Sequence, residues 1–272
     1  MVNETVQALT IAGTDSGGGA GVMADIKTMQ MRHVFSAAVV VAVTAQNTIG
    51  VQDFMAMSKK MIDEQFASVA DDLKIRACKT GMLADVPTVE AVVENLKKYD
   101  LGPLTVDPVM IAKGGARLLS EDAIATVREQ LLPLADILTP NLPEAEELAG
   151  MTINGRDDMI TAAKKLQAMG VKNVLIKGGH QVESKESSDF ILLKNGDSFW
   201  VSSPRVDTKR THGTGDTLSS CITAELAKGR DVETAIRIGK KYVSATIADG
   251  IQVGHGHGPL NHWATFDEEG DK

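Results

Sequence analysis

Short apolar runs alternate with amphipathic stretches along almost the whole chain, and this alternation limits the possible folds more than any other feature. The apolar runs are predicted to be strands and span Ala8–Ala12, Ser36–Thr44, Ile75–Lys79, Leu104–Val106, Asp136–Leu138 and Val174–Lys177. Helical stretches separate and follow them, over Val22–His33, Ser58–Leu73, Val86–Tyr99, Ser120–Leu131, Asp157–Met169, Thr217–Lys228 and Val232–Asp249. Strands that are apolar throughout and are separated by helices indicate a parallel sheet covered on both faces. The sequence therefore predicts an α/β fold.

The alternation breaks once, around the segment Asn195-Gly196-Asp197. Two strand-like runs, Asp189–Leu193 and Ser198–Val201, flank this segment, and Asn-Gly between such runs is typical of a hairpin turn. We therefore expect an antiparallel edge on an otherwise parallel sheet. No repeat or linker divides the chain, so residues 1–265 are expected to form a single domain. The charged residues 266–272 are expected to be a disordered tail.

The composition excludes several classes of protein. Lys and Arg number 28 against 36 Asp and Glu, a formal net charge of −8, whereas nucleic-acid binding requires surplus positive charge. An anionic substrate would therefore have to be held by local groups. No apolar run approaches the ~18 residues that a membrane span requires. Cys78 and Cys221 cannot form a disulfide framework, which is typical of the cytoplasm, where we expect the protein to act.

The segment Thr211–Thr217 reads Thr-His-Gly-Thr-Gly-Asp-Thr and opens a predicted helix. Glycines at a helix start leave backbone N–H groups free to point at one spot, which favours an anion there. Asp216 adds a carboxylate that could accept the proton of a hydroxyl group. Capping by Thr211 or Thr214 would explain one polar residue, but not two glycines and an acid together. Phosphoryl transfer requires an anion-stabilising loop beside a base, so this segment predicts a catalytic role for Gly213, Thr214, Gly215 and Asp216.

Other glycine and polar residues also follow predicted strands. The glycine-rich segment Gly13–Gly21 follows the first strand, but its spacing does not match the dinucleotide-binding fingerprint, and the chain has no P-loop motif. Asp107 and Lys177 stand at the ends of two other strands. Because the carboxyl ends of parallel strands meet at one edge of a sheet, we expect these positions to converge there with Gln46, Asn141 and Gly213.

The segment Thr139–Leu148 has two interpretations. Asn141, Pro143 and Glu144 could form an ordinary helix start, with Asn141 as the cap and Glu144 in the first turn. Alternatively, the carbonyl and carboxylate oxygens of this segment could hold Mg²⁺ and its waters near phosphates. The residues alone leave both interpretations open.

Several segments occur in the same order as in one known family and extend over nearly the whole chain. They are residues 9–28 (LTIAGTDSGGGAGVMADIKT), 42–52 (AVTAQNTIGVQ), 79–83 (KTGML), 107–110 (DPVM), 138–148 (LTPNLPEAEEL), 176–180 (IKGGH), 211–219 (THGTGDTLS) and 254–259 (GHGHGP). Through them the chain resembles the ribokinase-like superfamily, and within it the hydroxymethylpyrimidine/phosphomethylpyrimidine kinases of thiamine biosynthesis. The resemblance implies a three-layer α/β/α fold with a central, mostly parallel sheet. It also implies a homodimer that uses MgATP to phosphorylate 4-amino-5-hydroxymethyl-2-methylpyrimidine and then its monophosphate.

The resemblance implies roles for individual residues of this chain. A pyrimidine pocket would have Asp25 near the polar groups of the ligand and would be lined by Gly13, Ala20, Gln46, Met82 and Val109. The Mg²⁺ ion would be organised by Asp107, Asn141 and Glu144. Lys177 would act in catalysis by contacting the transferred phosphate. The nucleotide would be bound by Asp107, Asn141, Lys177, Thr208, Thr211, His212, Gly213 and Gly215.

One position departs from the pattern of the family. The pyrimidine kinases commonly carry Cys after Gly-Thr-Gly, whereas this chain has Asp216, as ribokinase and the larger pyridoxal kinases do. A pyridoxal or pyridoxine kinase of vitamin B6 salvage is therefore the alternative, although Gln46 disfavours it because such relatives often carry Met there. A ligand-binding protein that has kept a kinase fold is a third interpretation. The presence of base, anion-binding loop, metal and phosphate-binding residues together favours the enzyme.

Overall fold

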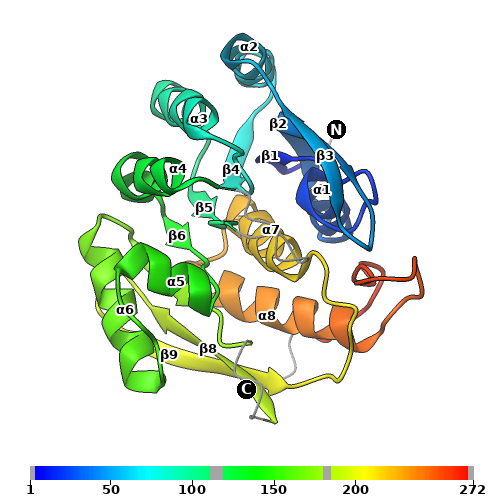
Figure 1. Ribbon diagram of the computed structural model, residues 1–272, viewed down its shortest axis with the longest axis vertical. Coiled ribbons are helices and arrows are strands. Elements are labelled where there is room, and N and C mark those ends of the chain that lie inside the picture. Colours follow the sequence, from blue (N-terminus) through cyan, green and yellow to red (C-terminus); the bar gives the residue numbers. More distant parts are fainter. Residues whose placement is uncertain (1–3, 111–118, 180–184, 269–272) are drawn as a thin grey trace.

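A computed structural model describes residues 4–110, 119–179 and 185–268. Within them one sheet has nine strands in the order β3-β2-β1-β4-β5-β6-β7-β8-β9 (Figure 1). The strands are β1 (Gln7–Gly13), β2 (Phe35–Gln46), β3 (Val51–Ala56), β4 (Ile75–Thr80), β5 (Leu104–Val106), β6 (Ile137–Leu138), β7 (Asn173–Ile176), β8 (Glu186–Leu192) and β9 (Ser198–Pro204). All pairings from β2 through β1, β4, β5 and β6 to β7 are parallel. The predicted parallel sheet is thus confirmed.

Both edges of the sheet are antiparallel. At one edge β8 pairs with β7 and with β9, so the predicted hairpin edge is confirmed. Gly196 in its turn has a φ of +90°, a left-handed conformation that glycine adopts without strain. At the opposite edge β3 pairs antiparallel with β2, and the sequence analysis missed this strand. Most residues of β3 are exposed, so the strand lacks the apolar alternation that identifies a half-buried strand.

Helices cover both faces of the sheet (Figure 1). One face carries α2 (Lys59–Ala70), α3 (Val86–Lys98), α4 (Glu121–Thr126), α5 (Leu142–Ala149) and α6 (Arg156–Ala168). The other face carries α1 (Gly21–Met31), α7 (Thr214–Ala227) and α8 (Val232–Ala248). The helix α4 continues into a π-helical turn over Val127–Leu131 and a 3₁₀ turn over Leu132–Leu134. The expected three-layer α/β/α fold is confirmed.

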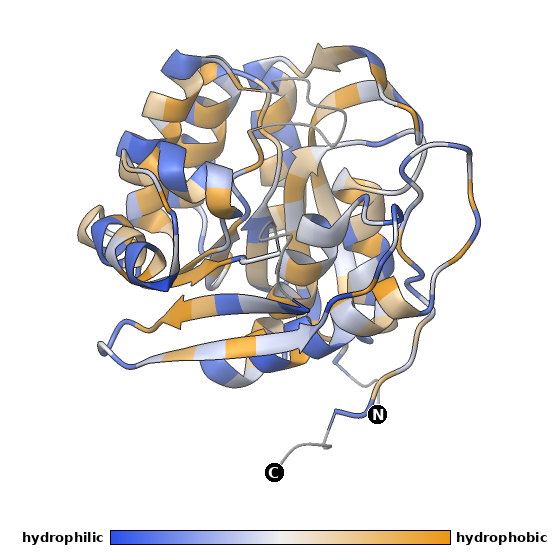
Figure 2. Ribbon diagram, turned by 60° about the horizontal axis from the view of Figure 1, so that its bottom comes forward, coloured by the Kyte–Doolittle hydropathy of each residue, from blue (hydrophilic) through white to orange (hydrophobic). Residues whose placement is uncertain are grey.

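Two aliphatic cores lie between the sheet and its helix layers. Leu9 and Ile11 of β1 enter the core under α2 and α3, whereas Ala8 of the same strand enters the core under α7 and α8. Successive side chains of a strand point to opposite faces, so one strand supplies both cores. Figure 2 shows the central strands as largely hydrophobic, while the helices carry both hydrophobic and hydrophilic residues. No helix in the described ranges is long and apolar enough to cross a membrane.

The parallel strands bring their carboxyl ends to one edge of the sheet, and the loops that follow them are tied together. The backbone N–H of Lys177, after β7, donates to the carbonyl oxygen of Pro140, after β6, at 2.8 Å. Asn141 and Lys177 also form an isolated parallel bridge. Similarly, the N–H of Gly13 donates to the carbonyl of Met82, after β4, at 3.1 Å. These bonds fix the loops that carry the predicted site residues.

The start of the C-terminal tail, for which the sequence predicts disorder, makes contacts with the rest of the protein through Phe266 and Glu268. The Phe266 ring lies 5.6 Å from the ring of Tyr242 on α8, measured between centroids. Glu268 forms an ion pair with Arg32 at 2.5 Å, and Arg32 is itself buried against Glu225 of α7. An aromatic contact and an ion pair both oppose the chain entropy that would be gained by disorder at this point. Residues 269–272 lie outside the described ranges.

Candidate active site

A large cleft of about 1270 Å³ opens at the carboxyl edge of the parallel strands. Such a volume exceeds the roughly 300–1,000 Å³ of a typical small-molecule pocket, so the cleft has room for two reactants. The structure brings together in its walls all but one of the residues singled out from the sequence: Gly13, Ala20, Gln46, Met82, Asp107, Val109, Asn141, Glu144, Lys177, Thr208, Thr211, His212, Gly213, Thr214, Gly215 and Asp216. The exception is Asp25, which is buried beneath the wall.

The first turn of α7 forms one wall, and two glycines allow it to approach its neighbours. Gly213 has a φ of +83°, and a Cβ at this position would overlap the carbonyl oxygen of Gly19. A Cβ on Gly215 would lie 2.9 Å from Oδ2 of Asp107. The Thr214 hydroxyl donates to the carbonyl of Thr211 at 2.7 Å, and no side chain in the described ranges caps the helix. The threonine-capping interpretation is therefore wrong, and backbone amides of this turn remain available to an anion.

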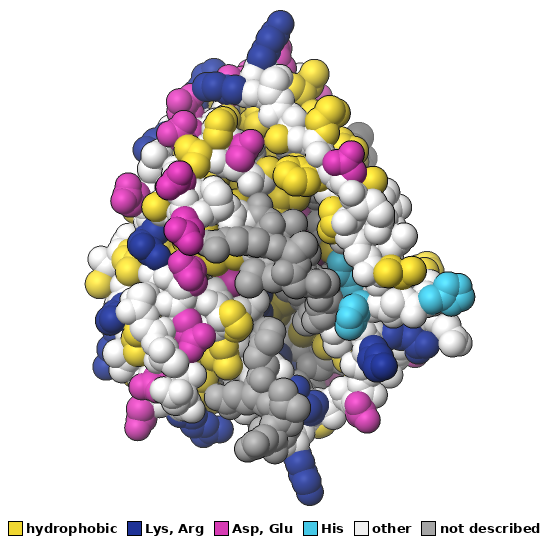
Figure 3. All heavy atoms as spheres, in the orientation of Figure 1, with side chains coloured by type: hydrophobic (Ala, Val, Ile, Leu, Met, Phe, Trp, Pro, Cys, Tyr) yellow, Lys and Arg dark blue, Asp and Glu magenta, His cyan; other side chains and the backbone are white. Residues whose placement is uncertain are grey.

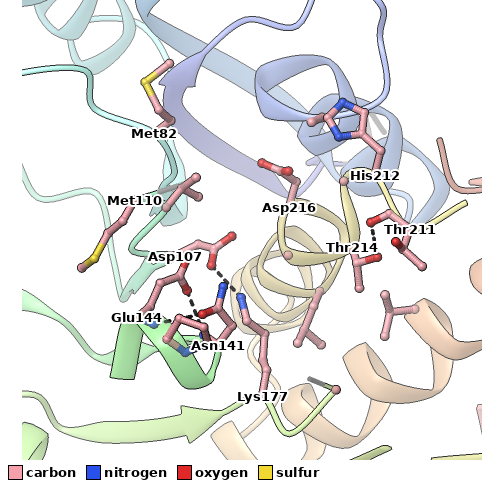
Figure 4. A pocket seen from close by; sticks show the side chains of 18 of the residues that line it. Met82, Asp107, Met110, Asn141, Glu144, Lys177, Thr211, His212, Thr214 and Asp216 are labelled. Atoms are coloured by element: carbon pink, nitrogen blue, oxygen red, sulfur yellow. Dashed lines mark hydrogen bonds and ion pairs between the residues drawn. The ribbon is translucent and has the colours of Figure 1, made fainter. Parts of the chain in front are cut away.

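Asp216 stands in this first turn, and Figure 4 shows it between His212 and the group around Asp107. Its side chain is 14% exposed, and Oδ1 lies 3.9 Å from the ammonium of Lys79. Burial raises the pKa of Asp216 to about 6, the negative charges of Asp25 and Asp107 add to the rise, and Lys79 opposes it. A carboxylate with such a pKa is a stronger base than an ordinary aspartate and remains largely ionised at neutral pH.

Asp107 and Lys177 form an ion pair on the far side of this turn. The Lys177 ammonium donates to Oδ1 of Asp107 at 2.9 Å, and the Thr139 hydroxyl donates to the same oxygen at 3.3 Å. Burial lowers the pKa of Lys177, but the charges of Asp107 and Glu144 outweigh it and raise the pKa overall. The second oxygen of Asp107, Oδ2, is buried and has no hydrogen-bond partner among the described residues. A buried carboxylate oxygen without a partner is costly unless a ligand completes it.

Asn141 and Glu144 confirm the capping interpretation of their segment, and Glu144 also lies in the wall of the cleft. They form a reciprocal capping box at the start of α5, in which each side chain accepts from the backbone N–H of the other residue, at 3.0 and 2.8 Å. Glu144 is also buried in the cleft wall. Burial raises its pKa to about 7, the charge of Asp107 adds to the rise, and Lys177 opposes it. A capping box alone would not require Glu144 to lie among the charges of Asp107 and Lys177.

Asp25, which is expected near the polar groups of the ligand, does not line the cleft among the described residues. Its side chain is fully buried on α1 and makes contacts with three other side chains of the protein. These partners are the hydroxyls of Thr10 and Ser220 and the ammonium of Lys79. Asp25 follows a glycine-rich loop in the sequence, which suggests proximity to a ligand, but it lies on the face of α1 that packs against β4 and α7.

The side chain of His212 lies next to Gln46 and Asp15 in the cleft. Its Nε2 is 3.3 Å from Nε2 of Gln46 and 2.9 Å from Oδ2 of Asp15. Burial raises the pKa of Asp15, but His212 and the amides of Gly17 and Gly19 lower it more, so the net shift is downward. The role of His212 in nucleotide binding, which the resemblance implies, stays a prediction.

Sequence reasoning missed two charged residues of the site. Asp15 organises the glycine-rich turn by accepting from the amides of Gly17, Gly19 and Ala20. Lys79 was taken as the last residue of a strand, although it has no exposed surface. The sequence contains a signal for each residue: Lys79 is a charged residue in an apolar strand, and Asp15 is a charged residue in a glycine-rich loop. A charged side chain that becomes buried at such a position requires a polar or charged partner.

Comparisons with known proteins agree with one another. The phosphomethylpyrimidine kinase family model matches residues 15–261. The chain is 50% identical over 260 residues to a hydroxymethylpyrimidine/phosphomethylpyrimidine kinase from Haemophilus influenzae, covering 95% of this chain and 97% of the relative. A phosphomethylpyrimidine kinase structure from Clostridium difficile 630 is 40% identical, with a TM-score of 0.79 over 89% of this chain and 99% of that one. An ADP complex of Bacillus subtilis pyridoxal kinase is 37% identical, with a TM-score of 0.89 over 96% and 98%.

The raised pKa of Asp216 predicts that this carboxylate destabilises the ligand-free protein. The ordinary pKa is 3.8 and the folded value is about 6, so ionisation is harder in the folded state. Stability is therefore lost as the pH rises through this window, and the loss persists above it. Asp216→Asn removes the penalty and should stabilise the protein above pH 6, on the order of 1–3 kcal/mol, but not below pH 4. Urea unfolding at several pH values measures this difference.

The matched control is Asp53→Asn, which changes an exposed carboxylate on β3. It should show no comparable pH-dependent gain. A loss of stability in Asp216→Asn at pH 8, or a gain of equal size at pH 4 and pH 8, would contradict the electrostatic origin.

Proposed function

The chain belongs to the phosphomethylpyrimidine kinase family, and we propose that it transfers phosphate from ATP to 4-amino-5-hydroxymethyl-2-methylpyrimidine. A second transfer, to the monophosphate, then gives the diphosphate used in thiamine biosynthesis. One observation carries this proposal: a basic carboxylate, Asp216, stands beside a free helix start in the cleft that also contains Gln46. That arrangement supplies a base, an anion site and a polar pocket wall within reach of two reactants.

The pyrimidine occupies the end of the cleft lined by Gly13, Ala20, Gln46, Met82 and Val109. The amide of Gln46 offers both a donor and an acceptor, which match the ring nitrogen and the exocyclic amine of an aminopyrimidine. The Met82 side chain lies against Gly13, where a Cβ would come within 2.6 Å of its Cε. Gly13 therefore keeps the pocket floor flat enough for an aromatic ring. A hydrogen-bonding group in the pocket wall discriminates between ligands, because a wrong ligand covers it and leaves it unpaired.

Asp216 acts as the general base for the first transfer. It orients the hydroxymethyl group and accepts its proton while the new phosphorus–oxygen bond forms. Negative charge develops on the transferred phosphoryl oxygens, and the amides around Gly213, Thr214 and Gly215 stabilise it there. The ammonium of Lys177 contacts the same phosphoryl group and neutralises part of its charge. Each contribution increases toward the transition state, which is the condition for raising turnover.

The nucleotide and a divalent cation occupy the other part of the cleft. Mg²⁺ would fit the donor set and would be held by Asp107, Asn141 and Glu144, since Asp107 has a buried carboxylate oxygen without a partner among the described residues and the other two residues lie in the cleft wall. When bound, the ion supplies charge neutralisation of the phosphates. Thr208, Thr211 and the Gly213–Gly215 loop hold the nucleotide through backbone and hydroxyl groups.

Phosphorylation of pyridoxal is the second candidate function. It is favoured by Asp216 in place of the Cys expected for pyrimidine kinases, and by the similarity to the pyridoxal kinase of Bacillus subtilis. Gln46 weighs against it, because a pyridine ring offers a different hydrogen-bonding edge from an aminopyrimidine. Measuring ATP consumption with hydroxymethylpyrimidine, its monophosphate and pyridoxal side by side separates the two functions.

The protein acts as a cytoplasmic homodimer. Large apolar side chains are exposed over β2 and β3 and in their connection: Phe35, Val43, Ile49, Phe54 and Met55. Figure 3 draws hydrophobic side chains over this corner of the molecule. Exposed apolar patches of this kind mark contact surfaces, and a second copy of the chain would cover them. The two free, buried cysteines are consistent with a reducing compartment.

Gln46→Met tests the assignment of the pyrimidine pocket. The change removes the amide donor and acceptor while keeping side-chain length, so the affinity for hydroxymethylpyrimidine should fall about 10- to 100-fold. The affinity for ATP should change little, because Gln46 lies at the other end of the cleft. Titration calorimetry with each ligand measures the two affinities, and Gln52→Met on exposed β3 is the matched control. Equal losses for both ligands, or no loss, would refute the assignment.

Asp216→Asn tests the general base. It keeps the shape of the side chain but removes the proton acceptor, so turnover on hydroxymethylpyrimidine should fall ~10²–10⁴-fold with ATP binding nearly unchanged. The monophosphate has an ionised phosphate as nucleophile and needs no base, so the second transfer should tolerate the change better. In the unaltered enzyme, kcat/KM for the first transfer should decline below pH 6, where Asp216 becomes protonated.

Two outcomes decide the role of Asp216. Asp216→Cys should keep more activity than Asp216→Ala, since a thiol is common at this position in the pyrimidine kinases. If Asp216→Asn impairs both transfers equally, the carboxylate acts by charge or positioning and the general-base role is wrong.

Glu144→Gln tests the cation site. The variant keeps an oxygen for the capping box but removes a negative charge, so the Mg²⁺ concentration for half-maximal activity should rise while the fold remains intact. Ser58→Ala is the matched control, because it removes the cap of α2, far from the cation-binding residues. Losing a cap costs about 1 kcal/mol of stability and should leave the Mg²⁺ requirement unchanged. If the Mg²⁺ titration of Glu144→Gln is unchanged, Glu144 only caps α5 and does not contribute to cation binding.

A further inference from the structure

Lys79, at the carboxyl end of β4, is a buried cation that the proposed reaction does not use. Its side chain has no exposed surface, and its ammonium lies 2.6 Å from Oδ1 of Asp25 and 3.9 Å from Oδ1 of Asp216. Removing an ammonium group from water is strongly unfavourable unless close partners compensate for it. A buried lysine 3.9 Å from the carboxylate of the proposed base therefore requires a functional explanation in addition to packing.

Its partner, Asp25, is held by groups from three elements. Oδ2 accepts from the hydroxyl of Thr10 on β1 at 2.5 Å, and Oδ1 accepts from the hydroxyl of Ser220 on α7 at 2.5 Å as well as from Lys79 on β4. The carboxylate is thus fixed in place and cannot follow a moving partner. It anchors the ammonium, which also lies 3.9 Å from Oδ1 of Asp216 in the wall of the cleft.

The helix that carries Ser220 also carries Asp216, one turn earlier. The network from Thr10 through Asp25 to Ser220 therefore joins the base of the site to β1, α1 and β4. Gly81, two residues after Lys79, borders this pair of charges, since a Cβ there would be in ordinary van der Waals contact with the Lys79 ammonium at 3.7 Å and with Oδ1 of Asp216 at 4.0 Å. No side chain intervenes at this point between the ammonium and the carboxylate.

The charges that face Asp216 come from several elements. Asp25 on α1 and Asp107 after β5 disfavour its ionised form, and Lys79 on β4 and His212 before α7 favour it. Lys177, after β7, also interacts with it. Lys79 is a fully buried cation in this set, and burial weakens the screening of a charge by solvent. The state of Asp216 thus depends on how the ammonium is shared between two carboxylates.

We propose that Lys79 is a positioning residue, which holds the carboxylate of Asp216 ionised and in place, and that Asp25 limits this effect by sharing the same ammonium. The proposal rests on the general-base function assigned to Asp216. It predicts opposite consequences for the two partners of one buried ion pair. Without Lys79, the base loses its nearest cation. Without the charge of Asp25, the ammonium of Lys79 is no longer shared between two carboxylates, and it stabilises the ionised form of Asp216 more strongly.

The test is the pH profile of kcat/KM for hydroxymethylpyrimidine in Lys79→Met and Asp25→Asn. The acidic limb should move up by about one pH unit in Lys79→Met, so that activity at pH 6 falls roughly tenfold relative to the plateau. In Asp25→Asn the acidic limb should move to lower pH. Thr10 and Ser220 can still donate to the amide oxygen in this variant. Both variants break a buried pair and should lose stability, so instability cannot explain shifts in opposite directions.

Two further variants separate the explanations. Arg32→Met breaks another buried ion pair, with Glu225, outside the cleft; it should lower stability and leave the limb unmoved. In the Asp216→Asn background, Asp25→Asn should no longer shift any limb. If Lys79→Met does not fold, Asp25→Asn still decides the matter, because a limb that stays in place or moves upward overturns the proposal. Full activity of Asp216→Asn would instead overturn the general-base function itself.

Discussion

Buried charges of alternating sign hold the site together. Two ammonium groups, at the ends of β4 and β7, lie among four carboxylates from α1, the loop after β5, α5 and α7; these groups are Lys79, Lys177, Asp25, Asp107, Glu144 and Asp216. In a low-dielectric setting each charge requires its neighbours, because an unpaired buried ion is strongly unfavourable. The parallel pairing of the strands is what brings these residues to one edge, so fold and electrostatics depend on each other.

The surplus of carboxylates over lysines gives this part of the cleft a negative charge, which would favour the cation proposed above. Two carboxyl groups have raised pKa values, about 6 for Asp216 and about 7 for Glu144, and one oxygen of Asp107 has no protein partner. These features destabilise the empty site, and a bound cation with its phosphates would relieve them. The two aliphatic cores beside the sheet stabilise the fold and offset the unfavourable energy of these buried carboxyl groups. Glycine at positions 213 and 215 permits the close approach of backbone and charge.

The parts of the structure that follow a strong periodic pattern could be predicted from the sequence. The parallel sheet, the hairpin at its edge and the convergence of polar residues on one cleft follow from apolar runs and from strand polarity. Exposed β3 could not be predicted, since neither of its faces is apolar. The orientation of single side chains was also out of reach: Asp25 turns into the protein and His212 toward Gln46, and both outcomes depend on tertiary partners. Phe266 packs on Tyr242 for the same reason, although its neighbours are charged.

The balance around Asp216 bears on why an aspartate can stand where the pyrimidine kinases commonly have a cysteine. A proton acceptor is most effective when its pKa is close to the working pH, yet it must remain ionised there. Burial and the charges of Asp25 and Asp107 move the pKa of this carboxyl upward to about 6, and Lys79 prevents a larger rise. An ordinary exposed aspartate would be ionised but weakly basic, and a buried one without a cation would be protonated. Lys79 would therefore be part of the same arrangement that allows Asp216 to serve as the proposed base.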